Sequence, residues 1–192
     1  MARIVSQCPK CGRANIKEIS HKKIGKFRYS EFSCGHSVVQ KLSITEDEKI
    51  QLEDGKTLWK FQVEGVHFAE KAGFNCLIAD QQGLGKTIQA IAILKLHWDE
   101  LRPILIVCKG SLVYRWQRFI LFGLKKFAQI IDRKTAIIPD LGIWIISFDM
   151  THKLHKDIEK LKIKTVIADE VQMIKNDDAK RTNGLRKIVR GE

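Results

Sequence analysis

The sequence predicts an α/β fold: a parallel sheet covered by helices, preceded by a small β-rich module. The first observation is an alternation of helical segments and short apolar runs that begins near residue 57. The apolar runs suit buried strands and lie at 74–79, 104–108, 143–148 and 165–168. Strands buried on both faces are continuous apolar runs, and helices between them favour parallel order. The second observation is that residues 1–41 have a different pattern, which indicates a separate unit.

Three segments follow from these patterns. Residues 1–41 show hairpin-like alternation around 24–26 and 38–39 and predict a small β module. The acidic stretch within 42–56 marks a boundary and is interpreted as a linker. The remainder, 57–192, is expected to form the α/β lobe.

Helices are expected over 57–72, 86–98 and about 112–122, where apolar residues recur near helical spacing. Two cysteines, Cys76 and Cys108, lie inside apolar runs and are expected to be buried, reduced thiols. The chain has five cysteines, and disulfides between them are not expected.

Composition restricts the class of protein. No stretch approaches the roughly 20 apolar residues of a membrane span, and no signal peptide is recognisable. We therefore expect a soluble, intracellular protein (of cytoplasm, nucleoid or nucleus) with no membrane partner. The formal net charge is +12, and residues 1–41 hold nine Lys and Arg against two acidic residues. Such a concentration of positive charge favours a nucleic-acid partner, the alternative being a solvated basic surface.

A glycine-rich stretch, DQQGLGKT at 80–87, lies between an apolar run and an apolar helix. Its glycines would let backbone N–H groups turn toward an anion, and the start of the helix adds its positive dipole end. Lys86 would reach the β- and γ-phosphates of a nucleotide, and the Thr87 hydroxyl would bind Mg²⁺. Asp80 stands where the generic motif has Gly. The alternative is an incidental strand-to-helix turn.

Two adjacent carboxylates, Asp169 and Glu170, follow the last apolar run. Ligands of a parallel sheet collect beyond the carboxyl ends of its strands, so this pair is expected beside the phosphate loop. Asp169 would hold Mg²⁺, directly or through water, and Glu170 would polarise the attacking water. With Lys86 they form the predicted catalytic set. For such a pair alone, a surface cap is the alternative.

The N-terminal module contains a metal-ligand pattern. Cys8 and Cys11 have the spacing of a zinc knuckle, and Cys34 with His36 would complete a Cys₃His set. A module of about 40 residues with few large apolar groups would need such a metal to fold. His21 is an outside substitute for His36. A redox pair at the first two cysteines is the competing interpretation, but the βαβ setting typical of such pairs is missing.

Five stretches, in order, resemble the motifs of Swi/Snf-type ATPases of helicase superfamily two. They are FQVEGV at 61–66, DQQGLGKT at 80–87, ILIVCKGSLV at 104–113 followed by Trp116, IISFD at 145–149, and VIADEVQMIKN at 166–176. The family itself commonly has Asp at the first position of the phosphate loop. The resemblance covers about two thirds of the chain, and it implies that 57–192 is part of a first RecA-like P-loop NTPase lobe.

The resemblance also implies roles for individual residues. Gln62 would contact the adenine, and the third and fourth stretches would contact the DNA backbone. The nucleotide-binding residues expected in this way are Gln62, Gly83, Leu84, Gly85, Lys86, Thr87 and Ile88. The DNA-binding residues expected are Lys109, Ser111 and Ser147.

The sequence departs from the family pattern at three places. Gln81 and Gln82 replace the usual Glu-Met, and Lys109-Gly110 replaces a usual Pro-Ala. Val171-Gln172 replaces the common Ala-His, so the His to which the family assigns coupling is absent, while the metal-binding carboxylates remain.

The family motifs continue beyond those seen here, into a Thr-Pro motif and a second lobe whose arginines touch the γ-phosphate. Removing such an arginine costs on the order of 10³–10⁵ in rate. We therefore expect this chain alone to bind Mg-ATP weakly and hydrolyse it poorly. The second RecA-like lobe would come from the rest of the protein or from another polypeptide.

The resulting functional hypothesis is the ATP-binding lobe of a DNA-dependent ATPase or translocase acting on double-stranded DNA, with ATP, Mg²⁺ and Zn²⁺ as cofactors. The preference for double strands rests on the resemblance. One alternative is a restriction-type or other superfamily-two motor. The other is a catalytically silent, zinc-containing DNA-binding adaptor that regulates a partner.

Overall fold

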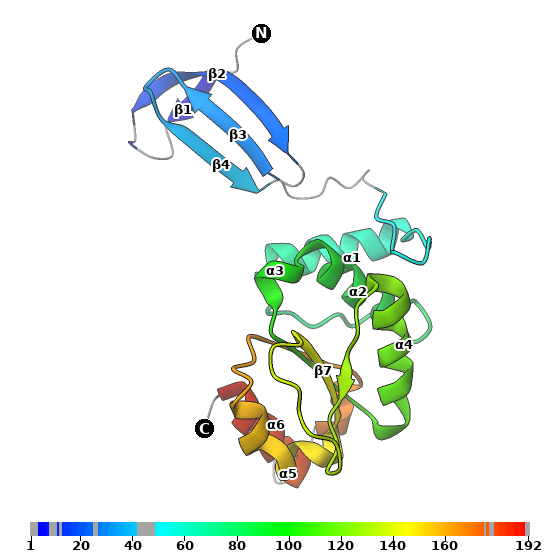
Figure 1. The fold of residues 1–192 in the computed structure, drawn as a ribbon. Helices are drawn as coiled ribbons and strands as arrows, with labels where there is room; N and C mark the ends of the chain where they lie inside the picture. Colours follow the sequence, from blue (N-terminus) through cyan, green and yellow to red (C-terminus); the bar gives the residue numbers. More distant parts are fainter. Residues whose placement is uncertain are drawn as a thin grey trace. The chain divides into compact units, whose positions relative to one another are not determined.

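The computed structural model divides into two compact units, Met1–Glu48 and Lys49–Glu192 (Figure 1). The residues that it describes are 4–7, 11, 13–24, 27–41, 49–174, 176 and 179–190. Each unit is considered by itself.

The first unit is an antiparallel sheet. Its strands are β1 (Ile4–Gln7), β2 (Ala14–Ile24), β3 (Phe27–Phe32) and β4 (Ser37–Lys41), hydrogen-bonded in the order β1-β2-β3-β4. At the hairpin between β2 and β3, Ile24 pairs with Phe27. This pairing agrees with the hairpin expected from the alternation of residue types.

The second unit contains a parallel sheet in the order β6-β7-β5-β8. Its strands are β5 (Ile104–Cys108), β6 (Gln129–Ile130), β7 (Ile143–Ser147) and β8 (Thr165–Ala168). Its α-helices are α1 (Lys60–Lys71), α2 (Lys86–Leu96), α3 (Trp98–Leu101), α4 (Val113–Leu124), α5 (Phe148–Glu159) and α6 (Lys180–Arg190). Two 3-10 turns, Gly110–Leu112 and Val171–Ile174, complete it. The predicted parallel α/β fold is confirmed.

The sheet is buried between two groups of helices. On one side α4 contacts β6, β7 and α2, and on the other α5 contacts β7 and α6 (Figure 1). All five residues of β5 are buried, as the continuous apolar run predicted. Alternate residues point to opposite faces, so Leu105 and Val107 join a core cluster with Phe148, Ile158 and Leu185 from α5 and α6. Burying each such side chain contributes about 1.5–3 kcal/mol.

The elements at the start of the second unit differ in detail from expectation. The predicted helix over 57–72 begins at Lys60, after a non-helical Trp59. Ile50 and Leu52, placed in the linker by sequence, are buried in this unit, with exposed fractions of 4% and 5%. Their apolar side chains therefore belong to its core.

Two helices were not expected from the sequence. Helix α5 buries three residues, Phe148, Thr151 and Ile158, while Met150 and Leu154 are half-buried against the same core cluster. Helix α6 packs against α5 where Gly184 approaches the backbone of His152 so closely that a Cβ would overlap it. Both helices have few apolar residues overall, and most of those lie on the face that packs against the core. Within the described residues, no helix is long and apolar enough to span a membrane.

The prediction of a buried strand over 74–79 is wrong. Residues 75–80 have no regular structure, Cys76 is exposed and Leu77 has 63% of its surface exposed. A strand needs a hydrogen-bonded neighbour, and no strand of the described chain pairs with this segment. The expectation of a buried Cys76 fails for the same reason, whereas Cys108 is buried as expected.

Candidate nucleotide-binding site

The second unit contains a cavity of about 720 Å³ that runs along β8 to the residues after its carboxyl end. One wall is formed by the segment before the phosphate loop and the start of α2, the other by β8 and the turn after it. The predicted functional residues that line it are Asp80, Lys86, Thr87, Asp169 and Glu170, joined by Trp116 from α4. The structure thus brings together both halves of the predicted site, although about eighty residues separate them in sequence.

The phosphate loop depends on two glycines. Gly83 and Gly85 have φ angles of 89° and 80°, in the left-handed region that favours glycine, and Gly85 caps the N-terminus of α2. A Cβ on Gly85 would lie 2.5 Å from Nε2 of Gln62, while a Cβ on Gly83 would meet nothing within 4 Å. The loop is therefore tightly supported at Gly85 and open at Gly83.

The Lys86 ammonium group lies within this loop. Its Nζ donates hydrogen bonds to the carbonyl oxygens of Asp80 at 2.7 Å and Gln81 at 3.1 Å. The cation is therefore held over the turn by backbone dipoles. An anion entering the turn would meet this ammonium and the N-terminus of α2 together.

Gln89 of α2 holds the phosphate loop through a side-chain hydrogen bond, a role that was not predicted from the sequence. Its Nε2 donates to Oδ2 of Asp80 at 2.6 Å, which fixes the first residue of the phosphate motif to α2. Gln89 is fully buried, and Gly65 of α1 provides the space for its amide, since a Cβ there would overlap it. The available signal was one polar residue within the otherwise apolar stretch of the helix over 86–98.

Gln62 joins α1 to the phosphate loop. Its Oε1 accepts a hydrogen bond from the backbone N–H of Trp59 at 3.0 Å, and its Nε2 donates to the carbonyl of Leu84 at 3.0 Å. Gln62 has only 4% of its surface exposed. The structure places it against the loop, and its expected contact with adenine stays a prediction.

The acidic pair follows β8 directly. The backbone N–H of Asp169 donates to the carbonyl of Val107, and its Oδ2 accepts a hydrogen bond from the Trp116 indole N–H at 2.8 Å. Glu170 is exposed and has a φ of 59°, a left-handed conformation that non-glycine residues adopt at a cost. The amide of Gln172 donates to the Glu170 carboxylate. Each carboxylate is thus oriented by a neighbouring side chain.

Cys108 lies behind this pair at the end of β5. Burial, followed by the negative charge of Asp169, raises the pKa of the Cys108 thiol to about 12. Cys108 is therefore a neutral thiol at physiological pH and acts as a packing residue rather than a nucleophile.

The three predicted DNA-contacting residues lie at or just after the carboxyl ends of β5 and β7. Lys109 and Ser111 are exposed in the turn after β5, and Ser147 ends β7, where it pairs in register with Cys108. A Cβ on Gly110 would lie 3.8 Å from Cβ of Ser147, so the turn after β5 is adjacent to the end of β7.

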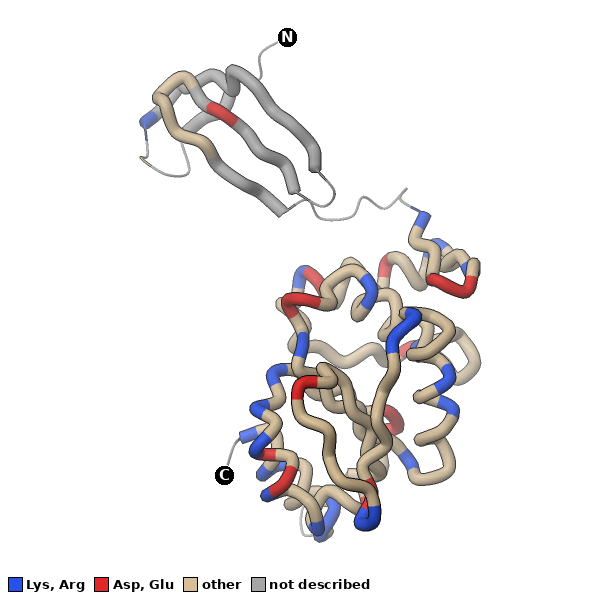
Figure 2. Tube along the Cα trace, in the orientation of Figure 1, with Lys and Arg blue, Asp and Glu red and all other residues tan. Residues whose placement is uncertain are grey.

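Helix α6 is the most one-sidedly charged helix of this unit, although other basic residues are spread along the chain. That helix carries five Lys and Arg and no acidic residue (Figure 2).

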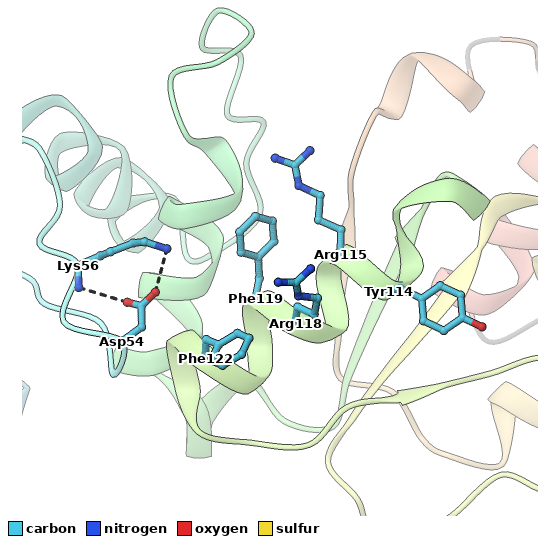
Figure 3. A pocket seen from close by; sticks show the side chains of 7 residues that line it. All are labelled: Asp54, Lys56, Tyr114, Arg115, Arg118, Phe119 and Phe122. Atoms are coloured by element: carbon cyan, nitrogen blue, oxygen red, sulfur yellow. Dashed lines mark hydrogen bonds and ion pairs between the residues drawn. The ribbon is translucent and has the colours of Figure 1, made fainter.

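A second hollow, of about 630 Å³, lies along the outer face of α4 (Figure 3). Arg115 stacks over the ring of Phe119 at 5.4 Å, and Tyr114 and Phe122 are also exposed there. The one carboxylate in its lining, from Asp54, is paired with Lys56 at 2.9 Å. With no free carboxylate in its lining and no phosphate loop, this hollow does not resemble the nucleotide site.

Three of the four predicted zinc ligands can be assessed in the first unit. The ligand atoms of Cys11, Cys34 and His36 all lie within 4.8 Å of one another, with Cys34 Sγ 3.6 Å from His36 Nδ1. Cys8 lies outside the described residues, as does the side chain of His21.

Comparison with known proteins agrees with this geometry. A family model for the SNF2-related domain matches residues 60–191. The DNA annealing helicase and endonuclease ZRANB3 of Homo sapiens is 34% identical over 143 residues, which are 69% of this chain and 13% of that protein. The SWI/SNF-related matrix-associated actin-dependent regulator of chromatin subfamily A-like protein 1 homolog of Caenorhabditis elegans is 33% identical over 131 residues, which are 65% of this chain and 19% of that protein.

A solved structure shows the same fold. The SWI2/SNF2 ATPase core of Sulfolobus solfataricus in complex with dsDNA superposes with a TM-score of 0.65 at 24% identity, covering 76% of this chain and 32% of that one. The chain therefore spans about a third of that ATPase core and less than a fifth of the two curated relatives named above. The family match over residues 60–191, together with the phosphate loop and the acidic pair on one cavity, establishes that this chain belongs to the SNF2-related family.

Proposed function

We propose that this chain is the ATP-binding lobe of a DNA-dependent ATPase that translocates on double-stranded DNA. The observation that carries the proposal is the convergence of Lys86, Thr87, Asp169 and Glu170 on one cavity. These residues come from opposite walls and supply a cation, a hydroxyl and two carboxylates. That is the set of groups that phosphoryl transfer requires.

The donor groups fit Mg-ATP. Mg²⁺ prefers oxygen ligands and keeps several waters, and the Thr87 hydroxyl and the Asp169 carboxylate offer oxygens on either side of the cavity. The open space over Gly83 leaves room for phosphate oxygens against the backbone N–H groups. Bound Mg²⁺ would neutralise negative charge on the transferred phosphoryl group.

The protein's own groups then have separate tasks. Lys86 would leave the carbonyls of Asp80 and Gln81 and bind phosphate oxygens, while Gln89 keeps Asp80 in position. Glu170 would orient the attacking water and accept its proton, helped by the exposed position of its carboxylate. Gln62, with Gly83, Leu84, Gly85 and Ile88, would hold the base and the phosphates.

DNA is the proposed activator. The turn that carries Lys109 and Ser111 and the adjacent end of β7 at Ser147 offer an ammonium, two hydroxyls and backbone N–H groups to a phosphate backbone. A relative named as a DNA annealing helicase and a structural neighbour solved with dsDNA support this assignment. Lys109→Ala should weaken duplex binding and reduce its salt slope by about one.

A second RecA-like lobe is part of the proposal, because the cavity has no arginine in its lining that could reach a γ-phosphate. We expect the isolated chain to bind Mg-ATP weakly and to turn it over slowly. Adding the complementary lobe, in the same or another polypeptide, should raise turnover by orders of magnitude.

The first unit is proposed to bind Zn²⁺ through Cys8, Cys11, Cys34 and His36. The proximity of three of these ligand atoms supports the site. Metal analysis should find one zinc per chain, lost in Cys11→Ser and retained in Cys76→Ser, whose thiol lies in the other unit. Equal zinc content in the two variants would refute the site.

The main test is Mg-ATP binding and turnover by the full chain, with and without duplex DNA. Lys86→Ala should weaken Mg-ATP binding by about 10- to 100-fold, because it removes charge-assisted hydrogen bonds. Lys95→Ala is the matched control, since Lys95 lies on the same helix but pairs with Glu53 at 2.8 Å. Equal nucleotide affinity in both variants would reject the nucleotide site. Zinc and DNA binding without any nucleotide binding would favour the adaptor.

A further inference from the structure

We propose that Trp116 is a positioning residue that links the DNA-contacting loop to the carboxylate of Asp169. This inference rests on the proposed function and adds a route by which DNA binding alters the nucleotide site. It is carried by one side-chain contact that crosses from α4 to the end of β8.

The contact is direct. The indole N–H of Trp116 donates a hydrogen bond of 2.8 Å to Oδ2 of Asp169, across 53 positions of sequence. Trp116 has only 3% of its surface exposed, and its ring lines the same cavity as Lys86 and Thr87. A buried indole N–H requires an acceptor, and a hydrogen bond to a carboxylate is stronger than one to a neutral group.

Asp169 depends on this donor for its orientation. Its backbone is fixed by the hydrogen bond to the carbonyl of Val107. Among the described side chains, Trp116 is the one shown donating to its carboxylate. With one oxygen held by the indole, the other oxygen is free to bind a cation or a water. Loss of the N–H would leave the carboxylate able to rotate about its χ angles.

The other end of Trp116 is tied to the DNA-contacting loop. Helix α4 begins at Val113, immediately after the turn Gly110–Leu112, and the backbone N–H of Leu112 donates to the carbonyl of Lys109 at 2.8 Å. Trp116 is therefore in the first turn of the helix that this loop starts. A displacement of Lys109 by a bound phosphate moves the base of α4, and with it the indole.

This geometry gives a specific expectation for the full chain. Duplex DNA should change the affinity for Mg-ADP by a factor in the usual range of coupling, about 5- to 150-fold. In Trp116→Phe, which keeps an aromatic ring and removes the N–H, that factor should fall toward one. The affinity for Mg²⁺ at fixed ADP should also fall several-fold, whereas the affinity for metal-free ADP should stay unchanged.

Trp144→Phe is the matched control. Trp144 is also buried, and its indole N–H also donates one hydrogen bond, to the carbonyl of Ile138 at 3.1 Å; neither residue lines the cavity. Replacing Trp116 by 3-benzothienylalanine, which keeps the ring shape and lacks the N–H, provides a second variant if Trp116→Phe does not fold.

The measurements are calorimetric titrations of Mg-ADP, of ADP with EDTA, and of Mg²⁺ into the ADP complex, each with and without duplex DNA. Loss of coupling in the Trp116 variants, but not in Trp144→Phe, would support the inference. Wild-type coupling retained in the Trp116 variants, or no coupling in the wild type, would overturn it while leaving the nucleotide site intact. Absence of any nucleotide binding by the wild type would overturn the proposed function, and the inference with it.

Discussion

Strand β5 and the segment 75–80 are both rich in apolar residues, but only β5 forms a strand. Both are short apolar runs that lead into functional loops. Strand β5 pairs with β7 on one edge and β8 on the other, and all five of its residues are buried. Segment 75–80 has no strand partner among the described residues and exposes Leu77. An apolar run therefore becomes a strand only where neighbouring chains satisfy its backbone N–H and C=O groups.

The segment 75–80 lies across the nucleotide cavity from strand β8. Strand β8 pairs only with β5, so its other edge has no partner in the described chain. The nucleotide cavity is lined by both that strand and residues 74–80. The phosphate loop thus follows a segment with no strand partner in the described chain, while the acidic pair follows a strand that is paired on one edge.

The largest loss of stability is expected when a side chain within β5 is truncated. Ile106 is completely buried at the centre of the sheet. Ile106→Ala should reduce the free energy of unfolding by about 2–5 kcal/mol, because it removes buried methyl groups and leaves a cavity. Denaturant titration of the full chain would measure it. A loss of unfolding free energy below about 1 kcal/mol would contradict the tight packing of β5.

A smaller effect is expected from the thiols at alkaline pH. The Cys108 pKa is raised from 9.0 to about 12 by burial, so the neutral form is favoured in the folded state. Its contribution to stability is complete below pH 9 and is lost as pH rises toward 12, by about 1.4 kcal/mol per pH unit. Stability measured from pH 8 to 11 should fall less steeply in Cys108→Ala than in wild type.

Cys76 is the internal control for that experiment. Burial also raises the pKa of Cys76, but the residue is exposed, so Cys76→Ala should alter the pH dependence much less than Cys108→Ala. Equal effects of the two substitutions would contradict the assignment of Cys76 to an exposed segment.

The smallest effect is expected at Leu77. Because 63% of its surface is exposed, Leu77→Ala should change the free energy of unfolding by no more than about 0.5 kcal/mol. Denaturant titration of Leu77→Ala and Ile106→Ala in the same buffer would compare their losses of unfolding free energy. A loss of 2 kcal/mol at Leu77 would mean that segment 75–80 is packed like a strand.

Three of the four strands of the parallel sheet were predictable from sequence, because β5, β7 and β8 are apolar runs separated by helices. Helices α5 and α6 were not predicted, because they contain few apolar residues overall, although most of those form the face that packs against the core. The strand predicted at 74–79 did not form because no neighbouring strand of the described chain pairs with it. Composition describes a segment, whereas pairing depends on its neighbours.

In the candidate site, too, some residues were predictable from sequence and others were not. The residues with chemical groups for the phosphates and metal, such as Lys86 and Asp169, were recognisable from motifs, and the structure places them on one cavity. The residues that hold them were not. Gln89 is the one polar residue in the apolar stretch from Ile88 to Leu94, and the Trp116 contact spans 53 positions, so only the fold reveals their partners.

The unpaired edge of β8 has a practical consequence for handling this chain. An exposed strand edge presents a row of free donors and acceptors, which is a template for pairing with another chain. Beside it lie an exposed leucine and an exposed thiol, at Leu77 and Cys76. Solubility of the isolated chain is therefore expected to depend on protein concentration and on a reducing agent, and a polar residue at position 77 is the first change to make for biophysical work.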